Sequence, residues 1–418
     1  MEYQKPKGTR DFFAEELGKR DSVRKIMEET ARSYGYEQVQ TPIFEEYSLF
    51  AAKSGEELKD NMYKFKDKGD RTMVLRPEGT ASIARLLVTE LKARPKPLKM
   101  FYFGPMFRYE QPQSGRYREF YQFGIECIGS KTSESDAEVI ALACETLEKM
   151  GLEYSLEIGQ LEIFRGLLRD MKIDGEKEDK VISLVDRGKI EEIDALLKEN
   201  KKAREMIDRL VKLKGEPKET LEKGKRLLEG NKSALDALAN LEEILSDLNA
   251  FGVKKYTIAL GMARGLAYYT GMIFEIRVGT LGAQNQIAGG GRYDRLVELF
   301  GGESTPATGF AFGFDRVCLS GPKLAEEKKR KNALIIPVGK TKKEAIKAFK
   351  ALKGAVDVEL DITGKGISKA LTYASTKGKE YTIIIGEKEA SAGKATLRDM
   401  KTGTQELLGL EEIAEKLT

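Results

Sequence analysis

The segment from residue 107 to residue 126 carries the side chains most suited to chemistry. Its sequence, FRYEQPQSGRYREFYQFGIE, places Arg108 and Arg116 near Glu110. Arginine binds phosphate well because its planar guanidinium donates two parallel hydrogen bonds and keeps its charge. Phe120 adds a flat ring on which a nucleotide base can stack. The segment therefore predicts a nucleotide site, and the alternative is a solvated hairpin with paired surface charges.

Two strands would have to position these side chains. Residues 99–108 and 119–128 are rich in the aromatic and β-branched residues that strands favour, and Gln113-Ser114-Gly115 between them is a turn signal. An antiparallel pairing of the two strands brings four polar side chains beside one another, namely Arg108, Glu110, Glu119 and Gln122.

Three further segments accompany the hairpin. They are LRPEGTA at 75–81, ARGLAYYTGMIFE at 263–275, and the pair AGGGRYDRLVELFGG and PATGFAFGFDR within 288–316. Alone, RPEGT would be read as a helix cap, because Thr80 is a good capping residue. Together with the hairpin, the set resembles the histidyl-tRNA synthetase family of class II aminoacyl-tRNA synthetases. The resemblance runs from Lys7-Gly8-Thr9-Arg10-Asp11 almost to the C-terminus, and its most specific part is the tyrosine pair after Arg264-Gly265-Leu266.

The resemblance implies a reaction and its participants. The family activates histidine with ATP to histidyl-adenylate and transfers it to the 3′ end of tRNA-His. ATP and Mg²⁺ are the implied cofactors, and the implied partners are tRNA-His, L-histidine and a second copy in a homodimer. Carried over residue by residue, the resemblance makes Arg108 and Arg264 the catalytic residues and Gln113 the tRNA acceptor contact. The residues that would bind ATP are Arg108, Glu110, Arg116, Phe120 and Arg316. The residues that would bind histidine are Glu78, Thr80, Gln122, Glu126, Tyr268 and Tyr269.

The resemblance also gives each arginine a role. Arg108 would hold the α-phosphate and the substrate carboxylate, Arg264 would face the α-phosphate from the other side, and Arg316 would hold the terminal phosphates. Fixed guanidiniums and Mg²⁺ stabilise the charge that builds on the phosphate oxygens during attack. The first step therefore requires no enzyme base.

Recognition of histidine is expected to rest on Glu126 and Tyr269, with Tyr268 close by. A carboxylate accepts one imidazole N–H and a phenol bonds the other nitrogen, so an apolar isostere would leave both groups unpaired. Glu126 ends an otherwise apolar run, where a buried carboxylate needs a ligand or partner. The substrate amino group would be received by Glu78, Thr80 and Gln122.

The chain departs from the family's pattern at several positions. Ala267 stands where many members have aspartate, Gln111 replaces a common arginine in the loop that meets the extra 5′ guanosine of the tRNA, and Arg295 replaces a usual glycine. The first two bear on the affinity for amino acid and tRNA more than on the reaction. Tyr121 and Gln160 stand where relatives commonly have histidine.

The 418 residues include no histidine and no tryptophan. The absence of histidine excludes catalytic triads built on it and removes the commonest metal ligand. Three scattered cysteines without C-x-x-C spacing predict neither a disulfide framework nor a zinc site, so a metal is expected only as Mg²⁺ on ATP. There is no apolar run of 18 residues and no signal-peptide pattern, which predicts a soluble, cytoplasmic protein.

Composition divides the chain into five parts. Residues 1–161 and 251–325 predict an α+β catalytic core with an antiparallel sheet flanked by helices, as in class II synthetases. Between them, 162–250 shows alternating charge with Leu and Ile at helical spacing, which predicts a helical insertion. Residues 326–331, EEKKRK, form a charged linker, and 332–418 alternate as in βαβ units of an α/β domain that resembles an anticodon-binding domain.

Net charge supports this division. Residues 331–418 hold 16 Lys and Arg against 12 Asp and Glu, which equals the net charge of +4 of the whole chain. A modest basic excess confined to one domain suits a polyanionic partner.

The expected elements of the core include a helix over 14–35 and a strand over 37–44 that contains Pro42. A proline in a strand marks an edge or an interface, and in the resembled family this helix and strand form the first class motif at the dimer interface. An ordinary edge strand is the alternative. Further expected elements are a hairpin over 62–75, a helix from Thr80 to about Arg94, and strands over 256–261 and 268–278.

Two other functions compete with the ligase. The first is a catalytically inactive paralogue, such as the regulatory subunit of ATP phosphoribosyltransferase, which lacks the C-terminal domain and loses ATP-binding arginines. The second is a tRNA-binding scaffold, which would not need Glu126 and Tyr269 together. Both are disfavoured, because residues 331–418 are present together with Arg108, Arg116, Arg264 and Arg316.

Overall fold

The structure is a computed structural model that describes residues 2–51, 56–111, 115–198, 200–263, 268–324 and 330–418. The chain forms two compact units, Met1–Leu324 and Ala325–Thr418, each with its own hydrophobic core. None of the helices in the described ranges combines the length and the apolar character needed to cross a bilayer.

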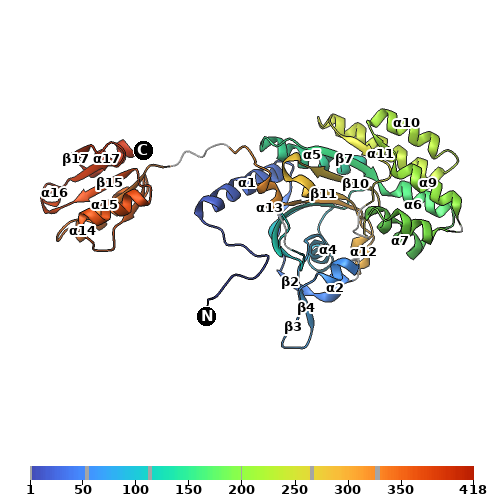
Figure 1. The fold of residues 1–418 in the computed structure, drawn as a ribbon, viewed down its shortest axis with the longest axis horizontal. Coiled ribbons are helices and arrows are strands. Elements are labelled where there is room, and N and C mark those ends of the chain that lie inside the picture. The colour runs from blue at the N-terminus through green and yellow to red at the C-terminus, as the bar shows by residue number, and fades with distance from the viewer. Residues whose placement is uncertain (1, 52–55, 112–114, 199, 264–267, 325–329) are drawn as a thin grey trace. The chain divides into compact units, whose positions relative to one another are not determined.

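A nine-stranded sheet forms the centre of the first unit (Figure 1). All neighbouring strands are antiparallel except the pairs β1–β5 and β7–β9. Alternate side chains point to opposite faces of such a sheet, so one face can pack on helices while the other faces a site. The order across the sheet is β1 (Glu37–Gln38), β5 (Leu98–Phe107), β6 (Glu119–Ile128), β12 (Ala307–Gly313), β11 (Gln286–Arg292), β10 (Met272–Arg277), β7 (Ser155–Gln160), β9 (Thr257–Ala259) and β8 (Lys214–Gly215).

One face of this sheet is covered by helices. The long helix α5 (Ser133–Lys149) packs across β6, β11 and β12, and α1 (Ala14–Ser33) and α11 (Lys232–Ala250) pack beside it. The fully buried Phe101 and Phe123 stack with ring centroids 5.4 Å apart in this layer. On the other side α4 (Thr80–Thr89) contacts β6, and α12 (Leu296–Leu299) packs on α4 (Figure 1). The remaining short elements of this region are η1 (Gly279–Gln284) and α13 (Phe314–Leu319).

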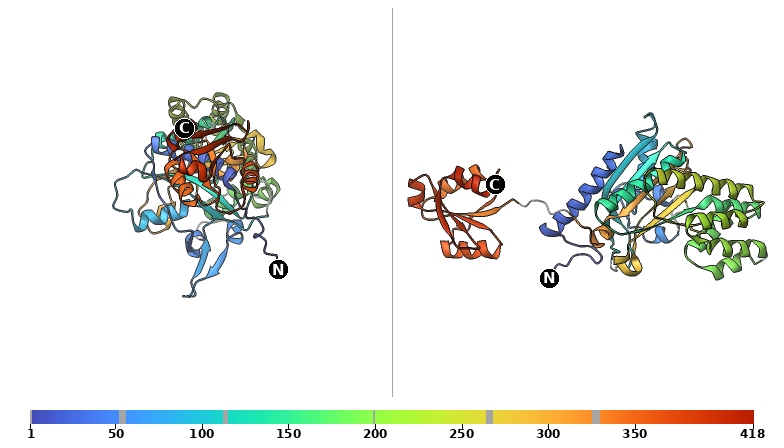
Figure 2. Two further views of the ribbon diagram at one scale, coloured as in Figure 1. Left: turned by 90° about the vertical axis from the view of Figure 1, so that its left-hand side faces the viewer. Right: turned by 90° about the horizontal axis from the view of Figure 1, so that it is seen from above.

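The helical insertion lies at the β7–β9–β8 end of the sheet (Figure 2). Asparagine side chains at positions 200 and 231 accept backbone N–H groups and start two of its helices, as capping predicts. The short strand β8 lies within the predicted helical region and pairs with β9, a strand that the sequence pattern did not indicate. The helices are α6 (Leu161–Asp170), α7 (Gly175–Asp186), α8 (Ile190–Leu196), α9 (Lys201–Val211), α10 (Pro217–Leu227) and α11.

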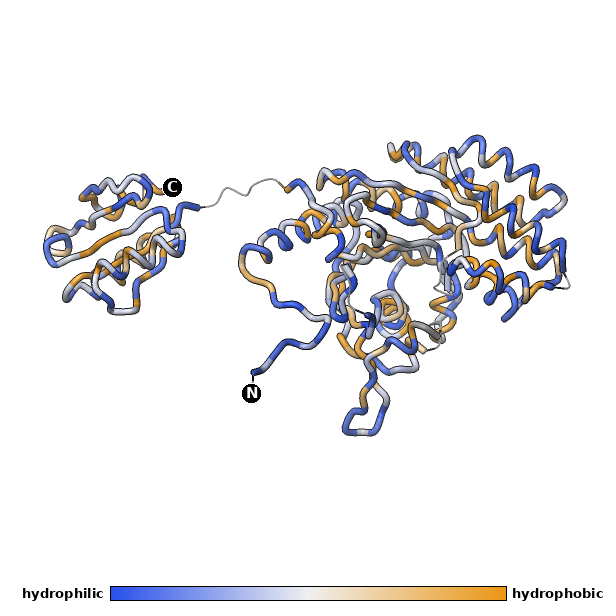
Figure 3. Tube along the Cα trace, in the orientation of Figure 1, coloured by the Kyte–Doolittle hydropathy of each residue, from blue (hydrophilic) through white to orange (hydrophobic). Residues whose placement is uncertain are grey.

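A second, three-stranded sheet projects from the first unit in the order β2 (Phe44–Glu46), β4 (Thr72–Leu75), β3 (Lys64–Lys66). The predicted hairpin over 62–75 is present and turns at residues 67–71, where the Asp67 carboxylate accepts two backbone N–H groups. Hydrophilic residues colour its tip, whereas hydrophobic residues follow the strands of the main sheet (Figure 3). The short helices α2 (Tyr47–Ala51) and α3 (Glu56–Asp60) also belong to this region.

Four predicted boundaries in the core were wrong. The strand expected over 37–44 is split into β1 and β2, because the Arg76 guanidinium binds the carbonyl oxygens of Thr41 and Pro42 and takes them out of any ladder. Helix α4 stops at Thr89 rather than near Arg94, because the N–H groups of Glu90 and Leu91 both bind the Leu86 carbonyl and close the last turn.

The third correction concerns the tyrosine pair. The strand expected from residue 268 begins only at Met272, so Tyr268 and Tyr269 precede β10. Thr270 explains the delay, because its backbone N–H binds the Arg292 carbonyl and its hydroxyl accepts the Asp294 N–H. Similarly, the strand expected over 256–261 shortens to β9.

The second unit is an α/β domain in which the predicted βαβ alternation is confirmed. Its sheet has the order β14-β13-β15-β16-β17, parallel among the first three strands and antiparallel in the last two pairings. Apolar clusters cover both faces of the sheet. The elements are β13 (Asn332–Pro337), α14 (Lys342–Leu352), β14 (Asp357–Leu360), α15 (Ile367–Thr376), β15 (Tyr381–Ile385), α16 (Glu387–Ser391), β16 (Ala395–Asp399), β17 (Gln405–Leu408) and α17 (Leu410–Leu417).

Candidate active site

A cavity of about 310 Å³ opens on the face of the main sheet that carries α4. Its walls come from β5, β6, β11, β12, the first residue of α4, the start of α13 and the segment before β10. Two predicted site residues, Arg264 and Gln113, lie outside the described residues. All the others line this one cavity: Glu78, Thr80, Arg108, Glu110, Arg116, Phe120, Gln122, Glu126, Tyr268, Tyr269 and Arg316.

Glycines let the strands approach closely at this point. A Cβ atom on Gly290 would lie 2.2 Å from the Gly309 carbonyl oxygen, and one on Gly309 would lie 2.4 Å from Oε2 of Glu126. The glycine-rich run of β11 therefore accommodates neighbouring backbone, as its sequence indicated. Gly309 in turn leaves room for the Glu126 carboxylate.

Arginines gather at one end of the cavity. The guanidinium of Arg108 lies 3.8 Å and that of Arg116 3.6 Å from the carboxylate of Glu110. Arg316 is anchored by bonds from Nε to the Gly115 carbonyl, at 3.0 Å, and from a terminal nitrogen to that of Gln286, at 2.8 Å. Burial, followed by the charge of Arg116, lowers the pKa of Arg316. Three cations held around one carboxylate form a site for an anion.

Arg108 also has an aromatic neighbour. Its guanidinium carbon lies 5.2 Å from the ring centroid of Phe120, and its Nε donates to the Pro77 carbonyl at 2.8 Å. The bond to Pro77 orients the guanidinium, and the contact with Phe120 is within the range of a cation–π interaction. Phe120 thus offers a ring face beside the arginine cluster.

Carboxylates gather at the opposite end. The buried Glu78 accepts the backbone N–H groups of Thr80 and Ala81 at 2.6 and 3.0 Å. Glu126 is 1% exposed and accepts the Thr80 hydroxyl at 2.8 Å and the Tyr293 hydroxyl on its other oxygen. The Thr80 side chain therefore joins α4 to β6 across the pocket.

Burial controls the protonation of both carboxylates. It raises the pKa of Glu126 to about 8, an effect that the bonds from Tyr293 and Thr80 oppose and that the nearby Glu78 adds to. Burial also raises the pKa of Glu78, against the backbone N–H bonds and the charge of Arg108. A cationic ligand, or one that donates hydrogen bonds, would favour the ionised form of these carboxyl groups.

Three tyrosines enclose the carboxylate end. Tyr268 and Tyr269 are buried with ring centroids 5.0 Å apart, and Tyr268 meets Tyr293 edge to face at 5.8 Å. Sequence reasoning missed Tyr293, although it lies in the glycine-rich segment that was singled out. The signal that could have indicated such a tyrosine is Glu126, because a buried carboxylate requires hydroxyl or N–H partners.

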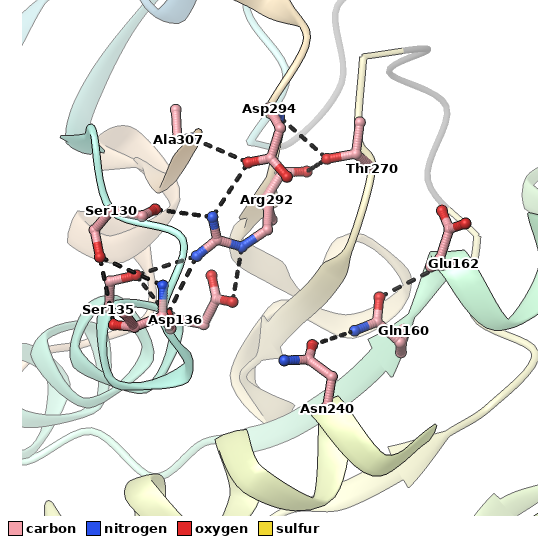
Figure 4. A network of polar contacts seen from close by, with 11 residues as sticks. Ser130, Ser135, Asp136, Gln160, Glu162, Asn240, Thr270, Arg292, Asp294 and Ala307 are labelled. Atoms are coloured by element: carbon pink, nitrogen blue, oxygen red, sulfur yellow. Dashed lines mark hydrogen bonds and ion pairs between the residues drawn. The ribbon is translucent and has the colours of Figure 1, made fainter. Parts of the chain in front are cut away.

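A buried ion pair supports this tyrosine cluster (Figure 4). Arg292 on β11 binds Asp136 of α5 at 2.9 Å and the carbonyl oxygen of Ser130 at 2.9 Å. Its own carbonyl accepts the N–H of Thr270, the residue after the tyrosine pair, and Asp294 binds the Thr270 hydroxyl through its N–H. The network thus fixes the segments on which Tyr269 and Tyr293 lie. In the same figure Gln160 binds Asn240 of α11 at 2.9 Å, which ties the insertion to β7.

Asp315, next to Arg316, was also missed by the sequence analysis. Its carboxylate binds Arg10 at 2.5 Å, Arg20 at 2.8 Å and the backbone N–H of Tyr121 at 2.6 Å. One side chain therefore joins the N-terminal segment, β6 and α13. No sequence spacing could indicate a contact between residues about 300 positions apart.

The comparisons with known proteins agree with this geometry. The family model described as histidyl-tRNA synthetase matches residues 8–317, and the one described as anticodon binding domain matches residues 332–418. The chain belongs to the histidyl-tRNA synthetase family. A "Histidine--tRNA ligase" of Methanocaldococcus jannaschii is 45% identical, with 98% of each chain covered, and one of Methanosarcina acetivorans is 44% identical over 100% of this chain and 99% of that one.

Solved structures of family members share the fold. A histidyl-tRNA synthetase from S. aureus superposes with a TM-score of 0.72 at 27% identity, and each chain is covered completely. A chain from Bacillus halodurans described as "ATP phosphoribosyltransferase regulatory subunit/histidyl-tRNA synthetase" gives 0.79 at 25% identity, over 92% of this chain and 99% of that one. The predicted class II fold is thereby confirmed. Membership over the full length makes the chain an aminoacyl-tRNA synthetase, and the regulatory alternative has no better support.

Proposed function

We propose that the cavity activates histidine with ATP and that the enzyme then transfers the histidyl group to the 3′ end of tRNA-His. The observation that supports this most is the polarity of the single cavity. Its arginine end suits a triphosphate, and its buried acid end suits an ammonium and an imidazole. Activation requires both substrates to lie in line within one pocket.

At the arginine end, the proposed roles follow from the contacts. Arg108 binds the α-phosphate and the substrate carboxylate, Arg316 and Arg116 bind the other phosphates, and adenine stacks on Phe120. A carboxylate oxygen of histidine attacks the α-phosphorus, the acyl phosphate bond forms, and pyrophosphate leaves with the electrons of the broken bond. The prearranged guanidiniums stabilise the charge on the phosphate, so the step needs no base.

Magnesium fits this end of the cavity. The described residues contain no cluster of three acidic or thiol side chains that would bind a metal by itself. The ion would therefore be held by phosphate oxygens with Glu110 as the protein ligand, and it would neutralise phosphate charge. Arg264, matched by resemblance to the family's catalytic arginine, is assigned to the other side of the α-phosphate.

At the acid end, the amide oxygen of Gln122 is buried and lacks a hydrogen-bond partner among the residues that the structure describes. An ammonium group would satisfy it, together with Glu78 and Thr80. Glu126 accepts an imidazole N–H, and a phenol of Tyr269 or Tyr268 bonds the other ring nitrogen. A side chain without two polar ring atoms would leave buried groups unpaired, which gives selectivity for histidine.

Further assignments concern the partners and parts of the chain. The exposed side chains of Phe44 and Phe65 on the three-stranded sheet, and of Ile43 just before it, would be covered by a second copy, in a homodimer. We assign the catalytic core to residues 1–161 and 251–325, the insertion to 162–250, the linker to 326–331 and anticodon binding to 332–418. We assign the tRNA acceptor contact to Gln113. The protein is assigned to the cytoplasm.

The decisive experiment is histidine-dependent exchange of pyrophosphate into ATP by the full chain. Exchange is expected with histidine and not with the other amino acids. Arg316→Ala should reduce it by roughly 10²-fold or more, as for the loss of one preorganised donor. Arg226→Ala, on the exposed surface of α10, is the matched control and should exchange normally. Absence of exchange in the unmodified, folded chain would refute the proposed activity.

A further inference from the structure

Tyr102 lies on β5 at the floor of the pocket and has no role in the assignments above. Its Cα pairs with that of Gly124 on β6, which places its side chain on the face that carries Gln122 and Glu126. It is 5% exposed and lines the cavity. The ring therefore lies between the side chain assigned to the ammonium group and the one assigned to the imidazole.

Two glycines hold the ring in place. A Cβ atom on Gly124 would lie 2.1 Å from the ring of Tyr102, and one on Gly79, just before α4, would lie 2.3 Å from it. No other residue type leaves this space, because such approaches are far below van der Waals contact. The position of the hydroxyl is thus fixed by the packing of the ring.

The hydroxyl itself is unsatisfied. It is buried, and no described residue meets it with the geometry of a hydrogen bond. The Thr80 hydroxyl lies close enough to interact with it, but Thr80 donates its own proton to Glu126. The nearby carboxylates bond other donors instead: Glu78 accepts two backbone N–H groups, and Glu126 accepts the hydroxyls of Thr80 and Tyr293. A buried hydroxyl without a partner destabilises a protein, and such groups often mark a site that a ligand completes.

We propose that the Tyr102 hydroxyl binds a polar atom of the bound amino acid, which makes Tyr102 a further specificity residue of the pocket. This inference rests on the proposed function. A phenol can donate and accept at once, so it suits a position between an ammonium and an imidazole. The two glycines at positions 79 and 124 then have a functional reason, since together they orient this hydroxyl.

The test is Tyr102→Phe in the full chain, with two measurements. The KM for histidine in pyrophosphate exchange should rise about fivefold to tenfold, the value of one hydrogen bond, with kcat little changed. The midpoint of thermal unfolding without ligand should stay equal or rise, because no internal bond is lost. A purely structural tyrosine would not combine these two effects.

Tyr36→Phe is the matched control. Tyr36 is equally buried, but its hydroxyl binds Glu138 at 2.9 Å and lies away from the cavity. This variant should unfold at a lower temperature and keep its KM for histidine. The contrast between the two variants separates ligand binding from packing.

Several results would contradict the proposed role of Tyr102. An unchanged KM, a lower unfolding temperature or a failure to fold in Tyr102→Phe would each overturn the inference while exchange by the unmodified chain stands. Absence of exchange in the unmodified chain would instead refute the proposed function. Inhibition by imidazolepropionate, which lacks the amino group, locates the contact: weaker inhibition of the variant assigns the hydroxyl to the ring, and equal inhibition assigns it to the ammonium.

Discussion

Replacing Glu126 by glutamine should make the empty protein more stable at alkaline pH while weakening histidine binding. The pKa of Glu126 lies at about 8 in the folded chain, against an ordinary value of 4.5. The native state therefore binds more protons than the unfolded state between these two values, so wild-type stability falls as pH rises through that range. The stability that comes from the extra proton on Glu126 in the folded state is fully present below pH 4.5 and lost above about pH 8.

The magnitude follows from the shift. Each pH unit is worth about 1.4 kcal/mol, so the penalty in the wild type approaches about 5 kcal/mol at pH 9. Glutamine has the same shape and no charge. Of the Thr80 and Tyr293 hydroxyls, one can still donate to the amide oxygen and the other can accept from the amide N–H. The free energy of unfolding of Glu126→Gln relative to wild type should therefore increase by several kcal/mol between pH 5 and pH 9.

Urea denaturation at a series of pH values measures this difference directly. In parallel, the KM for histidine at pH 8 should rise about 5- to 30-fold in the variant, because a neutral acceptor replaces a charge-assisted one. A difference in unfolding free energy that stays constant from pH 5 to pH 9 would refute the proton linkage. An unchanged KM would show that the imidazole of histidine does not bind to Glu126.

Three other perturbations test the remaining assignments. Arg264→Ala should lower the rate of pyrophosphate exchange by about 10²-fold while histidine binding, followed by calorimetry, persists; near wild-type exchange would remove its catalytic role. Ending the chain within 326–331 should preserve exchange and weaken tRNA charging, because the two units have separate cores, and loss of both activities in a folded fragment would show that the second unit supports the site. Asp136→Asn should lower the unfolding free energy by about 1–3 kcal/mol, since Arg292 then keeps only the partly exposed Asp294 as an ion-pair partner, and a thermal midpoint equal to that of wild type would contradict this.

Much of the fold could be predicted because local pattern and tertiary structure agree. The aromatic and β-branched residues of 119–128 and the Leu and Ile spacing of the insertion correspond to β6 and to α6–α11. Predictions failed where a distant side chain controls the backbone. Arg76 takes the carbonyl groups near Pro42, and Arg292 with Asp294 holds Thr270 before β10. No local pattern records such contacts.

The site was predictable to a similar degree and for a related reason. Charged groups such as Arg316 and Glu126 are conspicuous because folding must compensate their burial. Tyr102 and Tyr293 are missed because a tyrosine in an apolar strand or near a glycine run looks like ordinary core. Asp315 is missed because its partners at positions 10, 20 and 121 are far away in sequence.

The Asp315 contacts also set an order of events during synthesis on the ribosome. Tyr121 on β6 emerges 194 residues before the carboxylate that holds its N–H, and β6 pairs with β12 on the same side. At roughly 5–20 residues per second, the nascent chain carries an unpaired edge of β6 for about 10–40 seconds. Exposed strand edges are templates for aggregation. The N-terminal residues Arg10 and Arg20 likewise wait for Asp315, at the end of the first unit, before they can close on it.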